Sequence, residues 1–315
     1  MNRIRGNVGE GKMISVVIPT HNRVNLLGRA IKSAQEQTIK DIEIIVVSDG
    51  STDGTDDYMK KNFNNDHRIK YISYNPSRNG NYARNKGIEA SIGDYVAFLD
   101  DDDIWEKDKL EKQLNVIKAD NRIGLVYTGL TSIYVNEGYS YVVKPELEGD
   151  ISKDILMKNY IGTTSTVMVK KEIFAKSGMF DENLMALQDY DLWIRICQYT
   201  KVGIVKDSCI KYYNYTNKMQ ISKRTEKYEE TYYYLKKKYA ELFERLSSYE
   251  RNIQQKNYFL AIANLAMRNG SRRIATKYSS KALKSKLTLK GVAFLFLSII
   301  GNYKYALMLR KKFNV

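Results

Sequence analysis

The sequence predicts an α/β fold, with a mostly parallel sheet flanked by helices, followed by an α-helical C-terminal extension. From residue 14 to about residue 205, short β-branched and apolar runs alternate with longer amphipathic segments. Strands that alternate with helices form βαβ units with parallel strands. Beyond residue 212 the chain is rich in Tyr, Lys and Leu and has no proline, which is typical of helices. A chain of 315 residues can form one large α/β domain plus an appendage.

The elements follow from hydrophobic periodicity, from turn residues at their ends and from the apolar face of each amphipathic segment. The predicted strands are residues 14–18, 42–47, 69–73, 95–99, 124–127, 165–169 and 202–205. The predicted helices are residues 26–37, 55–63, 80–90, 105–119, 173–178 and 187–196. A polar hairpin is expected near Gly138, between two of the later strands.

The strand at 95–99 ends in four consecutive carboxylates, Asp100, Asp101, Asp102 and Asp103. Adjacent carboxylates repel each other and need a positive partner. Their oxygens suit hard cations such as Mg²⁺, Mn²⁺ or Ca²⁺. An acidic turn that caps the next helix is the alternative interpretation.

Polar residues also follow two other predicted strands. His21 and Asn22 come after the first strand, and Asp49 comes after the second. In open α/β sheets, ligands bind at the carboxyl ends of the strands. We therefore predict one site at this edge, formed by these residues and the four carboxylates.

Six segments, in the same order along residues 13–215, resemble glycosyltransferase family 2, the inverting enzymes of GT-A fold that use nucleotide-diphosphate sugars. They are residues 15–23 (SVVIPTHNR), 47–55 (VSDGSTDGT), 83–87 (ARNKG), 98–103 (FLDDDD), 180–182 (FDE) and 188–193 (QDYDLW). The resemblance implies a GT-A catalytic domain at 13–215, with a nucleotide-sugar-binding half at 13–110 and an acceptor-binding half at 111–215. Residues 1–12 are expected to be a loose leader and residues 216–315 a basic helical region.

The resemblance also implies a donor site. Asp49 matches the carboxylate that binds the nucleotide base, usually uracil, although a turn-forming Asp before glycine is the alternative. The nucleotide-binding residues implied are Pro19, Thr20, His21, Asp49, Arg84, Asp100 and Asp101. For Arg84, a salt bridge to a nearby acidic residue is the alternative. Asp100 and Asp102 match the DxD motif that holds Mn²⁺ or Mg²⁺ on the diphosphate, where a cation neutralises the charge of the leaving group. For Asp101 and Asp103, ligation, orientation of other groups and helix capping stay open.

Asp189 matches the catalytic base of the family, which takes the proton of the acceptor hydroxyl. A helix N-cap is the alternative role for this residue. Asp191 and Trp193 are candidates for the acceptor site. Two departures from the family pattern stand out, because Gln188 replaces the common Glu and the loop after the last strand lacks the usual Arg and His.

The net charge of +15 is concentrated in the tail. Residues 212–315 carry 22 Lys or Arg against 6 Glu and no Asp. The apolar run at 291–300 is about half of the roughly 20 residues needed to cross a bilayer. Residues 281–312 therefore predict a helix in an anionic membrane interface, with packing of 294–300 into a helical bundle as the alternative. Homo-oligomerisation through the C-terminal helices is a further expectation.

The function expected is an inverting, metal-dependent hexosyltransferase that moves a sugar from a nucleotide-diphosphate donor, UDP-linked by preference, to a glycan or lipid-linked acceptor in surface polysaccharide biosynthesis. The rivals are an inactive sugar-binding module of the same fold and a sugar-nucleotide pyrophosphorylase, whose glycine-rich signature is missing after the first strand. The tail has no recognised nucleic-acid motif, so no nucleic acid partner is expected. Two cysteines without metal-ligand spacing indicate the cytoplasm, with peripheral attachment to the inner face of the membrane.

Overall fold

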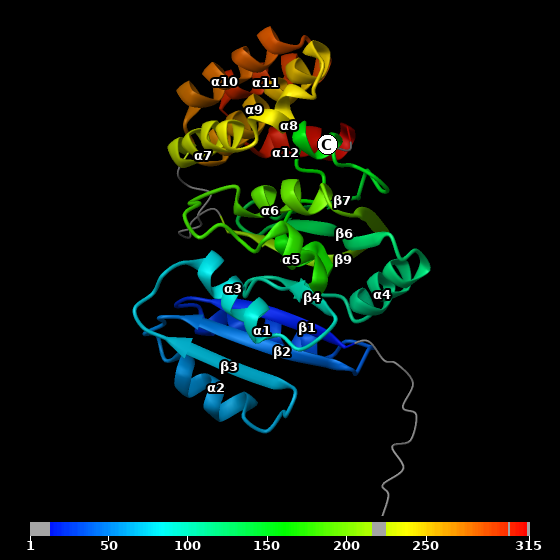
Figure 1. The fold of residues 1–315 in the computed structure, drawn as a ribbon. Coiled ribbons are helices and arrows are strands. Elements are labelled where there is room, and N and C mark those ends of the chain that lie inside the picture. The colour runs from blue at the N-terminus through cyan, green and yellow to red at the C-terminus, as the bar shows by residue number, and fades with distance from the viewer. Residues whose placement is uncertain (1–12, 216–224, 302, 314–315) are drawn as a thin grey trace, which may run out of the picture.

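The structure is a computed structural model that describes residues 13–215, 225–301 and 303–313 (Figure 1). The leader expected at residues 1–12 and the start of the predicted helical region at 216–224 lie outside the described residues. The strands are β1 (Ile14–Thr20), β2 (Ile42–Asp49), β3 (Ile69–Tyr74), β4 (Tyr95–Phe98), β5 (Ile104–Trp105), β6 (Ile123–Tyr134), β7 (Tyr139–Val143), β8 (Val167–Lys170) and β9 (Lys201–Asn214).

The helices fall into two groups along the chain. Those before β9 are α1 (Val24–Gln35), α2 (Thr55–Phe63), α3 (Gly80–Ala90), α4 (Lys109–Ala119), α5 (Phe174–Ser177) and α6 (Gln188–Cys197), with 3-10 turns at Asp154–Leu156, Thr164–Thr166 and Lys171–Ile173. Those after β9 are α7 (Thr225–Lys238), α8 (Ala240–Glu244), α9 (Ser248–Arg268), α10 (Arg272–Ser285), α11 (Leu289–Ile300) and α12 (Tyr303–Phe313).

One sheet connects all nine strands, in the order β3-β2-β1-β4-β8-β6-β9-β5, with β7 paired to β6. The pairs among β3, β2, β1 and β4 are parallel. β8 runs antiparallel to β4 and β6, and β6 and β7 form the predicted hairpin. The α/β class is therefore confirmed, and the sheet becomes mixed in its second half.

Alternate residues of the central strands fill two cores, one on each face of the sheet. Val16 and Ile18 of β1 face the core formed with α1, α2 and α4. Val17 faces the opposite core, which contains residues of α5 and α6. This division follows from the period of two along a strand, and burial on both faces explains the continuous apolar runs.

Several element bounds differ from the sequence prediction, and two of these differences arise from tertiary contacts. The last strand was expected at 202–205, but β9 continues to Asn214 because it pairs with β6 as far as Tyr134. Trp105 was expected to begin a helix, but it lies in the short strand β5. Its side chain is buried and its indole Nε1 donates to the backbone oxygen of Ser165 at 3.0 Å. Tertiary packing decides both cases.

The C-terminal helices stack above the α6 side of the sheet (Figure 1). Residues of α9, α10, α11 and α12 form a separate core. Leu235 and Phe243, from α7 and α8, enter the core beneath α6. Leu307 of α12 packs against Tyr134 and Tyr141 of the β6–β7 hairpin. None of the described helices combines the length and the apolar character that crossing a membrane requires.

Candidate active site

The predicted site edge forms where β1, β2 and β4 end side by side. β1 lies between β2 and β4 and runs parallel to both. The hydroxyl of Thr20, the last residue of β1, donates to Asp101 at 2.7 Å. The imidazole Nδ1 of His21 contacts the backbone oxygen of Asp49, the last residue of β2. The sheet thus brings together polar residues that are up to 81 positions apart in the sequence.

The four consecutive carboxylates separate into two pairs. Asp101 and Asp103 are buried, at 4 % and 0 % exposure. Asp101 accepts from Thr20 and from Arg23 at 2.8 Å, and Asp103 accepts from the Ser165 hydroxyl at 2.6 Å. Burial raises the pKa of both carboxyl groups, most strongly that of Asp103. Their contacts in this structure are with the protein, and nucleotide binding by Asp101 stays a prediction.

The other pair, Asp100 and Asp102, is more open, with side-chain exposures of 23 % and 14 %. Arg84 donates to Asp100 at 2.6 Å, and Arg23 donates to Asp102 at 3.0 Å. Burial raises the pKa of Asp102 to about 6, and Arg23 opposes that rise. The hydroxyl of Thr164 donates to both oxygens of Asp100 at 3.1 Å. These two carboxylates are the groups that remain accessible to a ligand.

The pair fits a divalent cation held jointly with a substrate. Mg²⁺ and Mn²⁺ usually take one or two protein carboxylates together with substrate phosphates, rather than a complete cage of side chains. Among the residues that the structure describes, no three His, Cys, Asp or Glu side chains are grouped so as to hold a metal ion alone. The donor set of Asp100 and Asp102 therefore matches a cation that arrives with a diphosphate.

Asp49 is 3 % exposed, and both its oxygens already have partners. The backbone amide of Arg78 donates at 2.7 Å and the hydroxyl of Ser77 at 2.9 Å. Asp49 thus fixes the loop that follows β3. A carboxylate has about four lone-pair sites, so these contacts leave acceptor capacity for a further donor such as the N–H of a base.

The other residues expected in the nucleoside pocket differ in exposure. Pro19 and Thr20 are buried, whereas His21 is exposed. The hydroxyl of Thr20 donates its hydrogen bond to Asp101, so this side chain stabilises the acidic turn. Of these three residues, His21 is the one whose side chain lies at the surface.

Asp189 lies in the first turn of α6, one residue after Gln188. The N-cap of α6 is Leu187, which has the left-handed φ of +53°. This position corrects the alternative that Asp189 caps the helix. The Asp189 carboxylate accepts from the backbone amide of Tyr190 at 2.7 Å. The left-handed backbone of Leu187 is strained for a residue other than glycine, and such strain is concentrated at functional sites.

The electrostatics of Asp189 connect it to the acidic pair. Burial raises its pKa to about 6, and the charge of Asp100 acts in the same direction. The Tyr190 amide and the charge of Arg84 lower it. Since Arg84 also pairs with Asp100, one guanidinium acts on both carboxylates. Asp189 therefore belongs to the same electrostatic neighbourhood as Asp100.

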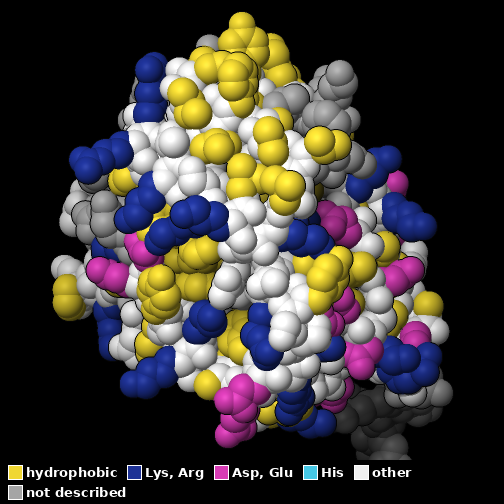
Figure 2. All heavy atoms as spheres, turned by 90° about the horizontal axis from the view of Figure 1, so that it is seen from above, with side chains coloured by type: hydrophobic (Ala, Val, Ile, Leu, Met, Phe, Trp, Pro, Cys, Tyr) yellow, Lys and Arg dark blue, Asp and Glu magenta, His cyan; other side chains and the backbone are white. Residues whose placement is uncertain are grey.

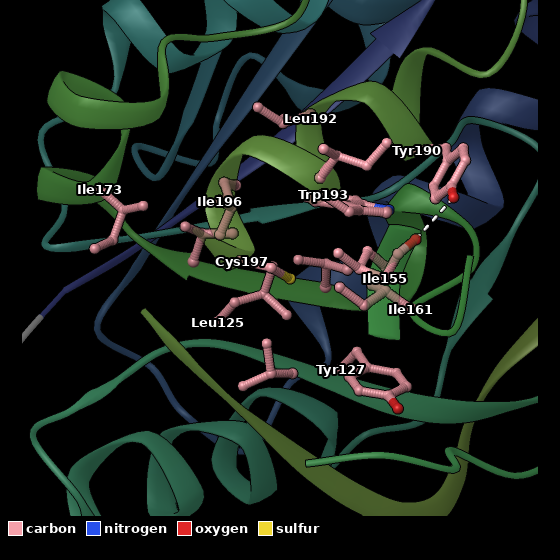
Figure 3. Packing of buried hydrophobic residues seen from close by; sticks show 14 of the residues in the cluster. Leu125, Tyr127, Ile155, Ile161, Ile173, Tyr190, Leu192, Trp193, Ile196 and Cys197 are labelled. Atoms are coloured by element: carbon pink, nitrogen blue, oxygen red, sulfur yellow. Dashed lines mark hydrogen bonds between the residues drawn. The ribbon is translucent and has the colours of Figure 1, made fainter. Parts of the chain in front are cut away.

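Asp191 and Trp193, the candidates for the acceptor site, are fully buried, and their role there stays a prediction. Figure 3 shows Trp193 packed among apolar side chains, and its indole Nε1 donates to the Gly162 oxygen at 3.0 Å. Asp191 accepts from Lys238 at 2.8 Å and from the Tyr239 hydroxyl at 2.6 Å. Asp191 therefore anchors the C-terminal helices to α6.

Several site residues were missed by the sequence interpretation. Thr164 and Ser165 hold Asp100 and Asp103, and the polar run at 163–166 before β8 was the available signal. Tyr228 of α7 is a second case. Burial and the charge of Asp189 raise the pKa of Tyr228 to about 12. No local pattern in the tail indicates that α7 reaches the neighbourhood of Asp189.

Solved structures share the fold over nearly the whole chain. Staphylococcus aureus TarS in complex with UDP has a TM-score of 0.58 at 14 % identity, covering 94 % of this chain and 91 % of that one. The mannosyltransferase PcManGT from Pyrobaculum calidifontis, in complex with GDP-Man and Mn²⁺, has a TM-score of 0.55 at 16 % identity, covering 96 % and 88 %. The fold is thus that of GT-A glycosyltransferases.

The sequence comparisons give the family. Residues 15–177 match Glycosyl transferase family 2, and the chain belongs to that family. An uncharacterized glycosyltransferase of Haemophilus influenzae is 29 % identical over 277 residues, covering 87 % of this chain and 91 % of the relative. A putative teichuronic acid biosynthesis glycosyltransferase of Bacillus subtilis is 31 % identical over 208 residues, covering 65 % and 80 %.

Proposed function

We propose that this protein is an inverting hexosyltransferase that moves a sugar from a nucleotide-diphosphate donor, UDP-linked by preference, to a hydroxyl of a glycan or lipid-linked acceptor in surface polysaccharide biosynthesis. The observation that carries the proposal is the shared electrostatic neighbourhood of Asp189, Arg84 and Asp100. It supplies a base candidate beside the group of residues suited to a diphosphate. The likeness to a UDP-bound structure and to a polysaccharide-biosynthesis relative supports the choice of donor and pathway class.

In the proposed reaction, the acceptor oxygen attacks the anomeric carbon while the bond from that carbon to the diphosphate oxygen breaks. Asp189 takes the hydroxyl proton, and the electron pair of the broken bond leaves with the diphosphate. A carboxylate with a pKa near 6 is ionised at neutral pH and is still basic enough to accept a proton. Arg84 stands beside Asp100, where it can favour the negative charge of a bound diphosphate.

We propose Mn²⁺ or Mg²⁺ as the cofactor, held by Asp100 and Asp102. Such a cation neutralises negative charge on the departing diphosphate. The acidic turn that contains Asp100 and Asp102 is held in place by the hydrogen bonds of Asp101, Asp103 and Thr164. Asp49 and His21 are proposed to contact the nucleoside.

A screen of nucleotide sugars tests the function. The expected result is metal-dependent donor hydrolysis, together with thermal stabilisation by UDP and Mn²⁺. Asp102→Asn should weaken both donor binding and hydrolysis, whereas Asp189→Asn should keep donor binding and lose transfer. Binding of donors without turnover on any acceptor or water would favour an inactive module, and formation of sugar nucleotides from sugar phosphates would favour a pyrophosphorylase.

We also propose peripheral attachment to an anionic membrane surface in the cytoplasm. One face of α11 packs on its neighbours through Phe294 and Leu297, as in the predicted alternative. The other face exposes apolar side chains, among them Leu289 at 92 %, Phe296 at 64 % and Ile299 at 59 %. Figure 2 shows hydrophobic side chains gathered at this end of the molecule beside groups of Lys and Arg. Both features suit an anionic interface.

Flotation with vesicles that contain anionic lipid tests this attachment. We expect the double variant Phe296→Ser and Ile299→Ser to reduce binding at least tenfold, and high salt to reduce it as well. Ile92→Ser, at an isoleucine that is 77 % exposed in the catalytic part, is the matched control and should bind normally. Concentration-dependent self-association without vesicle binding would instead identify a second copy of this chain as the partner of this face.

A further inference from the structure

Residues 180–184 lie between α5 and α6, and three asparagine side chains of α3 and its N-cap hold this segment. Asn79 is the N-cap of α3, and Asn81 and Asn85 lie within the helix. Asn81 and Asn85 are four residues apart, so their side chains leave the same face of the helix. Both are buried, at 3 % and 5 % exposure. The contact joins parts of the chain that are 100 positions apart.

Asn85 pairs with Phe180 through both ends of its side-chain amide. The amide nitrogen donates to the Phe180 backbone oxygen and the amide oxygen accepts from the Phe180 backbone amide, each at 2.9 Å. The nitrogen also donates to the Glu182 carboxylate at 3.0 Å. The Phe180 ring packs edge-on against Phe98, the last residue of β4, with the ring centroids 5.3 Å apart. Because its ring and its backbone are both held, Phe180 is a fixed point of the segment.

Asn81 and Asn79 hold the following residues of the segment by their backbone. Asn81 donates to the backbone oxygens of Asp181 and Leu184, at 2.9 and 3.1 Å. Asn79 donates to the backbone oxygen of Glu182 at 3.0 Å. The Asn79 side-chain oxygen also accepts from two backbone amides of the first turn, so this residue caps α3 and holds the segment at once. The loss of such bonds is costly because it leaves backbone oxygens unpaired.

The same stretch of chain is attached to the proposed donor site. The backbone amide of Arg78, directly before the N-cap of α3, donates to Asp49 at 2.7 Å. Arg84, within α3, donates to Asp100 at 2.6 Å. α3 and its N-cap loop therefore bind the groups proposed for the nucleoside and the diphosphate, and they bind the 180–184 segment as well.

The held segment leads directly to the proposed base. Leu187, the N-cap of α6 with a φ of +53°, follows three residues after Leu184, and Asp189 follows two residues later. A shift of the segment would therefore displace the Asp189 carboxylate. A general base must lie within hydrogen-bond reach of the proton that it takes. A misplacement of about 1 Å can reduce the rate by about 10²-fold.

We propose that Asn79, Asn81 and Asn85 are positioning residues for the transfer reaction, because by holding residues 180–184 on α3 they place Asp189 relative to the donor. The inference rests on the proposed glycosyl transfer and adds the residues that align its two halves. These asparagines act on the rate through Asp189, and contact with the substrate is not part of their role.

Hydrolysis of the nucleotide sugar that the wild type turns over fastest, measured on the full chain, tests the inference. We expect Asn85→Ala to lower kcat about 10- to 100-fold. The donor KM and the affinity for UDP with Mn²⁺, by calorimetry, should stay within about threefold of the wild type. An equal loss of kcat and UDP affinity would assign Asn85 to the donor site. That result, or an unchanged kcat, would overturn the proposal.

Gln37→Ala separates positioning from a general loss of buried hydrogen bonds. Gln37 is buried just after α1 and, like Asn85, donates to two oxygens and accepts from one backbone amide. Its partners are Ser33, Glu106 and Leu110. The variant should lose stability to urea as Asn85→Ala does and keep kcat within about twofold of the wild type. An equal fall of kcat in both variants would indicate general destabilisation and refute the inference.

Asn79→Asp keeps the cap of α3 and removes one hydrogen bond to the segment. The carboxylate can still accept from the two backbone amides of the first turn, but it cannot donate to the Glu182 oxygen. We expect kcat to fall about three- to tenfold with UDP affinity unchanged. An unchanged kcat would overturn the proposal for Asn79.

A double variant shows whether the effect passes through Asp189. Residues that act as a unit are not additive in their effects on kcat. In the Asp189→Asn background, Asn85→Ala should therefore change kcat by less than about twofold. A further fall as large as the one that Asn85→Ala causes in the wild type would overturn the inference.

Hydrogen exchange of the same samples, followed by mass spectrometry, keeps this inference separate from the proposed function. Exchange across residues 180–184 should be faster in Asn85→Ala than in the wild type, because the Phe180 amide loses its acceptor. If the wild type hydrolyses no nucleotide sugar, the proposed function fails, and the role of the asparagines in the reaction fails with it. If the wild type hydrolyses the donor and Asn85→Ala does so equally fast, the positioning role alone fails.

Discussion

Replacing Asp189 by asparagine should make the protein inactive and, at neutral pH, more stable. The side chain keeps its size, but the amide cannot accept the proton of an acceptor hydroxyl. General base catalysis typically contributes about 10²- to 10⁴-fold, so transfer should fall by a factor in that range. Donor binding should change little, because Asp189 lies on the acceptor side of the proposed reaction.

The magnitude of the stability change follows from the pKa. Burial raises the pKa of Asp189 from 3.8 to about 6, which means that ionisation is penalised in the folded state. Two pKa units correspond to about 3 kcal/mol. The value of about 3 kcal/mol is an upper limit, because Asp189 is only partly buried and solvent screens its charge. We therefore expect Asp189→Asn to increase the free energy of unfolding by about 1 to 3 kcal/mol. The penalty is complete above pH 6 and vanishes below pH 3.8, so the gain should follow the same window.

Urea unfolding at pH 8 and at pH 4, for the wild type and for Asp189→Asn, measures this effect. Asp181→Asn is a control of opposite sign. Lys238, 2.8 Å away, lowers the pKa of Asp181 against the effect of burial, so its charge stabilises the fold above its ordinary pKa and that substitution should destabilise the protein at pH 8. Transfer within tenfold of the wild type, or an unchanged free energy of unfolding for Asp189→Asn at pH 8, would refute the reasoning.

Three further substitutions test the electrostatics of the fold. Arg23→Gln leaves the buried Asp101 and the more open Asp102 without this cation and should cost about 3 to 5 kcal/mol by urea unfolding, with a larger loss at pH 8 than at pH 5; equal losses would contradict it. Asp191→Asn should weaken the contacts of Lys238 and Tyr239, lower stability by about 2 to 4 kcal/mol and speed proteolysis between α7 and α8; an unchanged digestion rate would argue against this anchor. Lys109→Met should raise stability by about 1 to 3 kcal/mol at pH 6, because burial lowers the pKa of Lys109 from 10.5 to about 7, and the gain should shrink between these two values as the folded wild-type lysine loses its proton.

The sequence predicted the elements whose pattern is local. The strand at residues 14–18 and the helix from residue 80 carry their own signals, and Asn79 caps α3 through its side chain as such a signal implies. The edge of the sheet where His21, Asp49 and the acidic turn meet also followed, because parallel strands place their carboxyl ends together. Periodicity and topology were sufficient for this half of the site.

The remaining features depend on contacts between distant residues. Asp101 and Asp103 look like their neighbours in the sequence, but the direction of each side chain in the turn decides which carboxylates Thr20 and Ser165 bury. Asp191 lies two residues after Asp189, and only Lys238, 47 positions away, reveals its structural role. Spacing along the chain does not encode such pairings, so sequence analysis could not assign them.

The anchoring of α7 onto α6 sets a practical boundary for anyone who wishes to shorten this protein. The stretch matched by the family ends at residue 177, before the proposed base and before the aspartate that Lys238 and Tyr239 hold. A fragment cut at that point would lack the reactive carboxylate, and one cut at residue 215 would leave Asp191 with Arg195 but without the contacts of Lys238 and Tyr239. The shortest fragment that keeps these contacts, for example in a chimera with a related protein, therefore extends at least to Tyr239.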